Sequence, residues 1–209
     1  MITPQRMSAQ SQPYVLLDRE FPDINANYVG VDDRKVGRMA TEHLLDIGCR
    51  NIAHIFGRGY STGNRRFEGY KEALENRGVP FSEDYAVHGA HVDTQGIEQG
   101  AAAMRILLQR NPRPDGVFCL NDLLAIGAMN AILDAGLRIP EDIAIIGCGN
   151  LPYNDSLRVG LSSIDQHTEK IGGHAAEIIL DLLEKPNSQP TRTVILEPAL
   201  VVRASSRRN

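Results

Sequence analysis

The sequence predicts an α/β protein with two lobes of parallel sheet flanked by helices, the N-terminal lobe being incomplete. From residue 50 onward, short β-rich runs alternate with amphipathic segments of helical length. This alternation is typical of strand–helix–strand units, whose strands lie side by side in a parallel sheet. The runs 116–120 and 143–146 are almost wholly apolar, as expected for strands that are covered on both faces.

The individual elements follow from apolar spacing and from the residues that interrupt it. Apolar residues at helical spacing predict helices at 34–47, 64–77, 95–109, 122–135 and 168–184. Gly48, Gly78 and Gly136 stand where three of these helices end. Runs rich in β-branched and aromatic residues predict strands at 14–17, 28–31, 51–56, 85–87, 116–120, 143–146, 193–196 and 199–202.

The two ends of the chain do not fit the same sheet as its middle. Residues 1–32 supply two short strands with no helix between them, and the helix at 168–184 follows the strand–helix series alone. We therefore predict a partial N-terminal lobe of residues 1–32 plus 164–191. We predict a C-terminal ligand-binding lobe of residues 33–163 plus 192–205, and a tail of residues 206–209.

The composition is that of a globular protein. Hydrophobic residues make up 42%, the formal net charge is -4, and no apolar run approaches the length that spans a bilayer. No dense basic face is evident, so we expect no strong nucleic-acid binding by this chain alone. The N-terminus has no secretory pattern, and Cys49, Cys119 and Cys148 are far apart. These features indicate reduced thiols, a cytoplasmic location, and neither metal nor cofactor.

Several stretches, in order along the chain, are similar to motifs of the lactose/galactose-repressor family of bacterial transcription regulators. They are Pro13–Arg19, Val31–Asp33 with Gly37 and Leu44–Gly48, Arg66–Leu74, Pro114–Ala128, Gly136–Gly147 and Glu197–Ser205. Each motif alone is weak, but together they cover nearly all of residues 13–205.

The resemblance implies a periplasmic-binding-protein fold of type I, which is a two-lobed fold that binds a ligand in the cleft between the lobes. It implies a ligand sensor rather than an enzyme, with a sugar or sugar derivative as the effector and a homodimer as the assembly. It further implies that operator DNA is bound by a helix-turn-helix head that this chain lacks, together with the first part of the N-terminal lobe. Effector binding would act on that head by linkage, through its differential affinity for two arrangements of the protein.

The candidate ligand-binding residues combine the resemblance with the rule that parallel sheets bind ligands beyond the carboxyl ends of their strands. They are Arg66, Asn121, Asp18, Thr62, His91, Gln166 and Asn150. A guanidinium can donate two parallel bonds to sugar hydroxyls or to a carboxylate, and an amide both donates and accepts. Ordinary structural roles stay open: a surface ion pair of Arg66 with Glu68 or another acid, helix caps by Thr62 and Asn121, and a solvated loop position for His91.

Some positions depart from the family pattern. After Gly147 the family usually has an aromatic residue and then an Asp that contacts ligand hydroxyls, whereas this sequence has Cys148-Gly149-Asn150. The carboxylate is thus missing, or is replaced by Asn150, which speaks against an ordinary hexose. Tyr60 stands where purine-sensing relatives carry an Arg, which speaks against a purine.

Two other classes of function compete with a repressor. Gly59-Tyr60-Ser61-Thr62-Gly63 matches the nucleophile pattern of α/β hydrolases, and Asp155 and His174 follow in the required order. Four residues, Gly57 to Tyr60, stand between the preceding strand and Ser61, however, whereas a hydrolase serine would stand directly at the end of the strand. A periplasmic sugar-binding protein of an uptake system would share the fold, but it would need a signal peptide.

Overall fold

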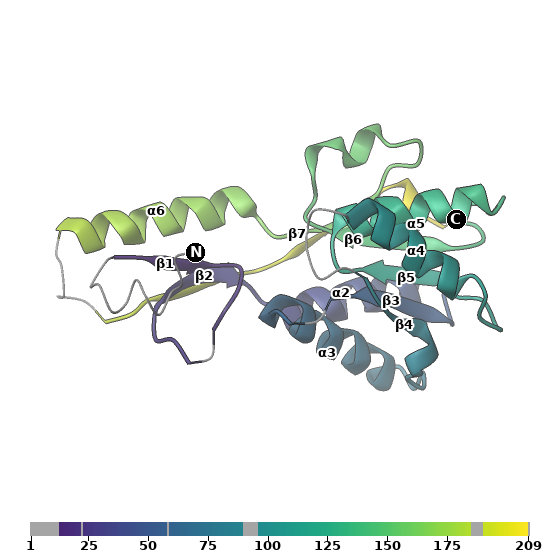
Figure 1. Ribbon diagram of the computed structural model, residues 1–209, viewed down its shortest axis with the longest axis horizontal. Coiled ribbons are helices and arrows are strands. Elements are labelled where there is room, and N and C mark those ends of the chain that lie inside the picture. Colours follow the sequence, from purple (N-terminus) through teal and green to yellow (C-terminus); the bar gives the residue numbers. More distant parts are fainter. Residues whose placement is uncertain (1–12, 22, 58, 90–95, 185–189, 209) are drawn as a thin grey trace. The chain divides into compact units, whose positions relative to one another are not determined.

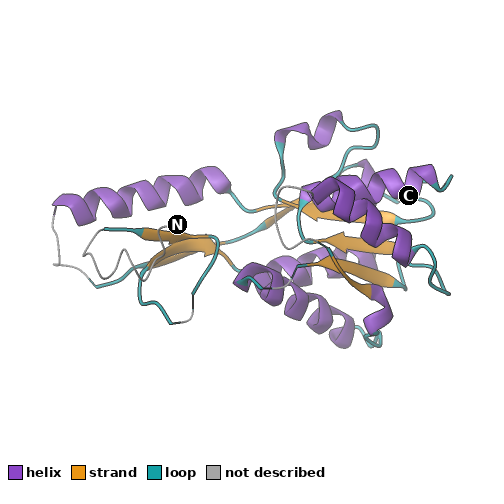
Figure 2. Ribbon diagram, in the orientation of Figure 1, coloured by secondary structure: helices purple, strands orange, loops and turns teal. Residues whose placement is uncertain are grey.

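The computed structural model describes residues 13–21, 23–57, 59–89, 96–184 and 190–208, and the chain folds as two compact units. Unit 1 comprises Met1–Asp32 and Gln166–Glu197, and unit 2 comprises Asp33–Asp165 and Pro198–Asn209. Each unit contains a sheet with parallel strands and flanking helix (Figure 2), so the predicted α/β class is confirmed. None of the helices in the described residues is long and apolar enough to cross a membrane.

Unit 2 is built on a six-stranded sheet in the described part of the chain. In spatial order the strands are β4 (Ala86–His88), β3 (Ile52–Phe56), β5 (Gly116–Cys119), β6 (Ala144–Cys148), β7 (Ser162–Asp165) and β9 (Ala199–Val201). Neighbouring strands are parallel except β7 and β9, which pair antiparallel. The sequence analysis missed β7 as a strand, because its two buried serines, Ser162 and Ser163, do not form an apolar or β-branched run.

Helices cover both faces of this sheet (Figure 1). The helices α2 (Asp33–Asp46) and α3 (Ser61–Asn76) pack together, and so do α4 (Gly96–Leu107) and α5 (Asp122–Asp134). Alternate strand residues point to the two layers. On the α4–α5 side, Ile55 and Val117 join a fully buried apolar core with residues such as Met104 and Leu124.

Unit 1 contains a three-stranded parallel sheet in the order β1 (Val15–Leu17), β2 (Asn27–Val31), β8 (Thr193–Leu196). The helix α6 (Thr168–Glu184) lies beside this sheet and buries Ile171, Ala175 and Ile178. Because β8 pairs with β2, residues 192–197 belong to unit 1, whereas the sequence analysis had assigned them to the C-terminal lobe.

Three short 3-10 helices complete the described chain: η1 (Glu83–Tyr85), η3 (Pro152–Ser156) and η4 (Ala204–Ser206). The predicted tail begins inside η4, at a residue that is fully buried. The Ser206 hydroxyl hydrogen-bonds Ser162 Oγ at 2.7 Å and His43 Nε2 at 2.9 Å. Ser206 is therefore part of the packed unit 2.

Glycines set the distance between the paired helices of unit 2. A Cβ on Gly37 of α2 would lie 2.0 Å from the carbonyl oxygen of Arg66 on α3, and a Cβ on Gly69 would lie 2.0 Å from that of Arg34. Gly100 and Gly127 play the same part between α4 and α5, with distances of 2.1 and 1.9 Å to opposing carbonyl oxygens. Both helix pairs are thus packed backbone to backbone, and any side chain at these positions would separate them.

We predict that Gly37→Ala lowers the free energy of unfolding by about 1–3 kcal/mol, because the added methyl forces a close-packed helix pair apart. The control is Gly172→Ala on α6, where nothing lies within 4 Å of the new Cβ. That change should be neutral or stabilise the helix by about 0.5–1 kcal/mol. Urea denaturation followed by far-UV circular dichroism measures both. Equal effects at the two positions would contradict the packing argument.

His54 is a fully buried titratable residue in the middle of β3. Its ring stacks on Phe118, with centroids 4.4 Å apart and planes 4° from parallel. Nδ1 lies 2.9 Å from the Phe118 carbonyl oxygen, so this nitrogen carries the proton and donates it. Nε2 has no hydrogen-bond partner among the described residues. Burial lowers the pKa of His54 from 6.5 to about 3, so the ring is neutral at physiological pH.

We predict that the free energy of unfolding falls as the pH falls below about 6.5. His54 then binds a proton in the unfolded chain but stays neutral in the folded protein. The loss from this residue approaches about 1.4 kcal/mol per pH unit. His54→Phe should reduce the slope, as measured by urea denaturation between pH 7 and pH 4.5. Tyr70→Phe removes a 2.8 Å hydrogen bond to Ile52 in the same cluster and should lower stability without changing the slope. An unchanged slope in His54→Phe would contradict the assignment.

Candidate functional site

The carboxyl ends of the parallel strands in unit 2 meet at one edge of the sheet, and four of the predicted residues lie at this edge. Arg66 and Thr62 belong to α3, which follows β3. Asn121 follows β5, and Asn150 follows β6. Ligands of open parallel sheets bind at this edge, so these residues remain candidates for ligand contact.

Arg66 is buried at this edge and links α2, α3 and the end of β5. It is 4% exposed, its Nε donates to Asp33 Oδ1 at 2.7 Å, and its Nη1 donates to the Leu120 carbonyl oxygen at 2.7 Å. The ion pair is buried on both sides, whereas the structural alternative in the sequence analysis was a surface pair with Glu68 or another acid. The sequence analysis did not single out Asp33 as the partner, although Asp33 stands in one of the motifs quoted above.

The hydrogen bonds around the Asp33–Arg66 pair offset the cost of burying its two charges. Burying two charges is costly unless each is paired and hydrogen-bonded, and here the guanidinium satisfies both a carboxylate and a backbone carbonyl. Asp33 is also the first residue of α2, where the helix dipole favours a negative charge. Arg66 is therefore held in one position, and its contact with Leu120 places it next to Asn121.

Asn121 caps α5. Its Oδ1 accepts a 2.9 Å hydrogen bond from the backbone N–H of Leu124, which confirms the capping role that the sequence left open. Within the described residues, its Nδ2 makes no hydrogen bond in the structure. Thr62 is buried in the first turn of α3, but the N-cap of that helix is Tyr60, so Thr62 is not the cap.

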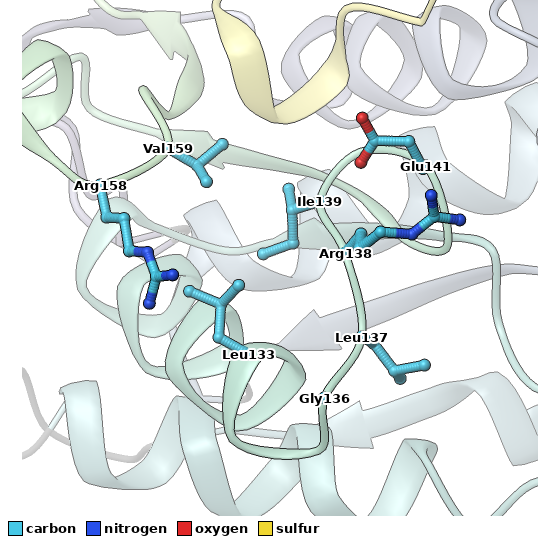
Figure 3. A pocket seen from close by; sticks show the side chains of 8 residues that line it. All are labelled: Leu133, Gly136, Leu137, Arg138, Ile139, Glu141, Arg158 and Val159. Carbon is cyan, nitrogen blue, oxygen red and sulfur yellow. The ribbon is translucent and has the colours of Figure 1, made fainter.

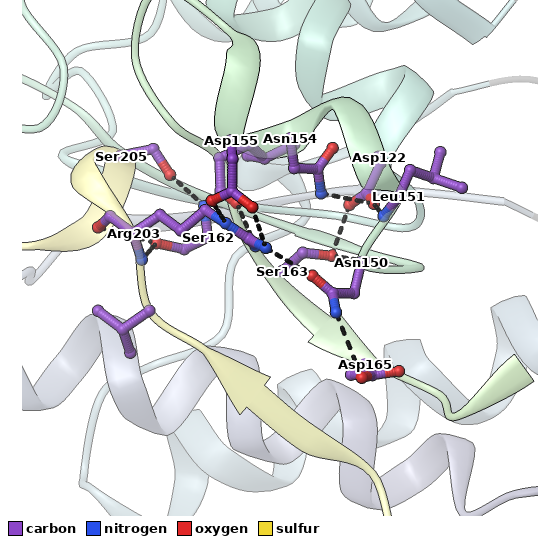
Figure 4. Close-up of polar contacts among 12 residues, drawn as sticks. Asp122, Asn150, Leu151, Asn154, Asp155, Ser162, Ser163, Asp165, Arg203 and Ser205 are labelled. Carbon is purple, nitrogen blue, oxygen red and sulfur yellow. Dashed lines mark hydrogen bonds and ion pairs between the residues drawn. The ribbon is translucent and has the colours of Figure 1, made fainter.

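Asp122 ties together the strand ends around β6 and β7. This carboxylate is fully buried and accepts from Ser163 Oγ at 2.6 Å, from the Leu151 N–H at 3.0 Å and from Asn154 Nδ2 at 2.9 Å (Figure 4). Asp122 is the first residue of α5, where a negative charge favours the start of the helix. In the structure it also fixes the chain that leaves β6.

Asn150 is held at both ends of its amide. Its Nδ2 donates to Asp165 Oδ2 at 3.2 Å, and its Oδ1 accepts from Arg203 Nη2 at 2.9 Å. Its backbone N–H donates to Ser163 Oγ at 2.9 Å, and its φ of 49° lies in the left-handed region, which Asn tolerates. Protein groups thus use one donor and one acceptor position of the amide and fix its orientation.

Arg203 completes this network (Figure 4). Arg203 forms an ion pair with Asp155 and donates to the Leu161 carbonyl oxygen at 3.0 Å. This pairing lowers the pKa of the Asp155 carboxyl. Gly149 has a φ of 131°, and a Cβ there would lie 3.3 Å from Asp122 Oδ2. A side chain at Gly149 would thus be strained and crowded. The sequence analysis did not single out Arg203.

The predicted residues Asp18 and Gln166 belong to unit 1. Asp18 follows β1 and Gln166 follows β7, and within unit 1 Gln166 Nε2 donates to Asp18 Oδ1 at 3.2 Å. Asp18 has a φ of 60°, and its carbonyl oxygen accepts from the Tyr28 hydroxyl at 3.2 Å. His91 lies outside the described residues.

A pocket of about 420 Å³ opens at the opposite edge of the unit 2 sheet (Figure 3). Its lining comes from the end of α5 and from the segments that lead into β6 and β7: Leu133, Gly136, Leu137, Arg138, Ile139, Glu141, Arg158 and Val159. These segments precede the strands, so the pocket contains none of the predicted ligand-binding residues.

The residues of the hydrolase pattern have other roles. Ser61 is the first residue of α3, Asp155 is paired with Arg203, and His174 Nδ1 contacts Glu177 at 3.2 Å on α6. Ser61 and Asp155 belong to unit 2 and His174 to unit 1. The geometry within each unit gives no support to a catalytic triad.

Residues 41–206 match the protein family described as a periplasmic binding protein-like domain. The chain is 33% identical over 205 residues to the HTH-type transcriptional regulator CelR of Thermobifida fusca, covering 97% of this chain and 59% of that protein. It is 35% identical over 198 residues to the ribose operon repressor of Haemophilus influenzae, covering 94% of this chain and 58% of that protein. The chain thus spans less than two thirds of the length of these relatives.

Solved structures give the same result. A transcriptional regulator CelR–cellobiose complex superposes with a TM-score of 0.89 and 32% identity, covering 97% of this chain and 61% of that one. A LacI-family regulator of Enterococcus faecium with bound ribose has a TM-score of 0.85 and 27% identity, covering 96% and 73%. These relatives and neighbours are transcriptional regulators and not enzymes. The chain therefore belongs to the lactose-repressor family of transcription regulators and covers its periplasmic-binding-protein-like, effector-binding domain.

Proposed function

We propose that this chain is the ligand-sensing core of a bacterial transcription repressor that binds a small polar effector, a sugar or sugar derivative. The observation that carries the proposal is the buried Asp33–Arg66 pair, which fixes a guanidinium beside Asn121 at the carboxyl edge of the sheet. The proposed contacts on this edge are Arg66, Asn121 and Thr62. Operator DNA would be contacted by a head outside these 209 residues.

The chemistry of these groups supports a hydroxyl-rich ligand. A guanidinium donates several hydrogen bonds in a fixed plane, a hydroxyl both donates and accepts, and the Asn121 amide nitrogen can donate. The residues come from two different strand–helix connections and are fixed by buried contacts. Such preorganisation lowers the entropy cost of binding. The relatives described with cellobiose and with ribose make carbohydrates the first compounds to test.

The proposed mechanism is linkage. An effector changes DNA affinity only to the extent that it binds two arrangements of the regulator with different affinity. Coupling free energies of this kind are about 1–3 kcal/mol, which corresponds to a change of about 5- to 150-fold in DNA affinity. Catalysis plays no part in this mechanism.

We predict that at least one neutral sugar in a panel that includes cellobiose and ribose raises the melting temperature of the chain. At a ligand concentration of 100 times Kd, binding contributes about 2.7 kcal/mol of stability, which is well within the range of a thermal-shift assay. Failure of every sugar to bind, measured also by isothermal titration calorimetry, would contradict the proposed function.

We predict that Arg66→Ala abolishes the sugar-induced shift. This variant leaves Asp33 as a buried charge without its partner, so its own melting temperature should also fall. Thr62→Val, which removes one hydroxyl and keeps the shape, provides the milder variant and should weaken binding about tenfold while leaving the fold intact. Arg65→Ala, at the exposed neighbouring position, is the matched control and should bind as the unchanged chain does. A full shift in both Arg66→Ala and Thr62→Val would refute the site assignment.

The proposal includes a homodimer that acts in the cytoplasm. Exposed apolar side chains on unit 2, among them Ile97, Ile106 and Tyr153, offer surface that a second copy could cover. Sedimentation equilibrium of the chain should give a dimer mass, and a strictly monomeric protein at all concentrations would remove the homodimer from the proposal without affecting effector binding.

A further inference from the structure

The pocket at the amino ends of β6 and β7 shares no residue with the proposed effector contacts. Its volume of about 420 Å³ is within the range of about 300–1,000 Å³ that is usual for small-molecule sites. Four of its lining side chains are apolar and are buried or half-buried: Leu133, Leu137, Ile139 and Val159. The pocket therefore offers an apolar surface to the body of a small molecule.

The segment 136–141 forms one wall of this pocket and is fixed from behind. The Arg138 carbonyl oxygen accepts from the Ile143 backbone N–H at 3.2 Å. Arg208 Nε, near the C-terminus, donates to the Pro140 carbonyl oxygen at 2.9 Å. Because these contacts hold the wall in place, binding of a ligand would have to order little additional chain.

Three charged residues line the pocket, and their contacts differ. Arg138 is occupied by Asp142, which accepts from its Nε at 3.1 Å and from its Nη2 at 3.0 Å. These hydrogen bonds lower the pKa of the Asp142 carboxyl to about 2. Glu141 interacts electrostatically with the same Arg138. Arg158, by contrast, makes no hydrogen bond or ion pair with the residues that the structure describes.

Figure 3 shows how these groups divide the pocket. Arg158 and Val159 lie on one side, Arg138 and Glu141 lie on the other, and Ile139 lies between them. A guanidinium donates two parallel hydrogen bonds to a carboxylate, so the Arg158 side suits one anionic group. Glu141 would repel a second anionic group on the far side.

We propose that this pocket is a second small-molecule site, which takes a monocarboxylate with an apolar body about as large as a phenyl ring. The carboxylate would pair with Arg158, and the apolar body would lie against Leu133, Ile139 and Val159. The effector contacts proposed above lie at the opposite edge of the sheet, so this inference does not depend on the proposed function.

The experiment measures binding of phenylacetate to the 209-residue chain by isothermal titration calorimetry. Phenylacetamide has the same shape without the charge, and its Kd should be about two- to fivefold higher, because an ion pair at an exposed guanidinium contributes little. Acetate lacks the ring and should bind at least about tenfold more weakly. Absence of phenylacetate binding, or equal binding of all three compounds, would overturn the inference.

The place of binding is checked by nuclear magnetic resonance of the backbone amides. Titration with phenylacetate should shift the signals of residues 133–141 and 158–159 and leave those of Thr62 and Asn121 unchanged. Shifts confined to other segments would overturn the assignment of the site.

Substitutions then test the groups in the pocket. Arg158→Gln should raise the Kd of phenylacetate about two- to fivefold and leave that of phenylacetamide unchanged. Val159→Phe fills the pocket and should weaken both compounds. The matched control is Arg105→Gln, at an exposed arginine of α4 outside the pocket, which should change neither Kd. An unchanged Kd in Arg158→Gln, or an equal rise in Arg105→Gln, would overturn the role of Arg158.

The far side of the pocket is tested with a dicarboxylate. We expect para-phenylenediacetate, which carries a carboxylate at each end, to bind more weakly than phenylacetate. Glu141→Gln should remove this difference, because it removes the repelling charge. A difference that persists in Glu141→Gln would overturn the preference for a single carboxylate.

Two further comparisons separate this pocket from the rest of the protein. Repeating the titration at a much higher chain concentration should give the same Kd, whereas a Kd that rises would show that a second copy covers the pocket and would overturn the site. Thr62→Val, which weakens sugar binding in the proposed function, should leave phenylacetate binding unchanged. Loss of phenylacetate binding in Thr62→Val would place the ligand at the effector edge and overturn the inference. Circular dichroism confirms that each variant is folded.

Discussion

The buried ion pair between Asp33 and Arg66 is the interaction on which the candidate site depends. It joins the first turn of α2 to α3, and through the Leu120 carbonyl it joins both helices to the end of β5. The pair forms because Gly37 lets the two helices approach until backbone meets backbone at Arg66. The close packing of α2 and α3 thus fixes the Arg66 guanidinium, a hydrogen-bond donor, at the edge of the sheet.

A second set of polar groups fixes the edge of the sheet at the ends of β6 and β7. Asp122, Ser163, Asn150 and Arg203 link the residues after β5 and β6 with β7 and with the segment that follows β9. Most of these groups are buried or half-buried, and their bonds cross between elements far apart in sequence. Neutral donors surround the Asp122 carboxylate and ion pairs hold Arg66 and Arg203, so this part of the edge is rigid.

The sequence predicted most elements because their signals are local. Apolar spacing located α6 at its observed bounds, and the buried runs located β5 and β6 within two residues. The strand β7 escaped because its inward positions are serines, whose burial depends on partners such as Asp122 and Ser205 that are distant in sequence. The partner of Arg66 and the role of Arg203 escaped for the same reason. Composition cannot indicate which acid meets which base across the fold.

The full satisfaction of Asp122 also determines which parts of this protein could be redesigned. Its Oδ2 accepts from two N–H groups and its Oδ1 accepts from the Ser163 hydroxyl, so an isosteric amide could keep these contacts only if its NH₂ faced Ser163 and that hydroxyl became an acceptor. An exchange at Asp122 would therefore disturb the hydrogen bonds that hold the chain after β6. Asn150 and Asp165 are half-buried, and Asn150 is linked to Asp122 through Ser163. These two residues lie at the outer side of the network. An engineer seeking a sensor for a new compound could vary these two rim residues while the framework beneath them stays as it is.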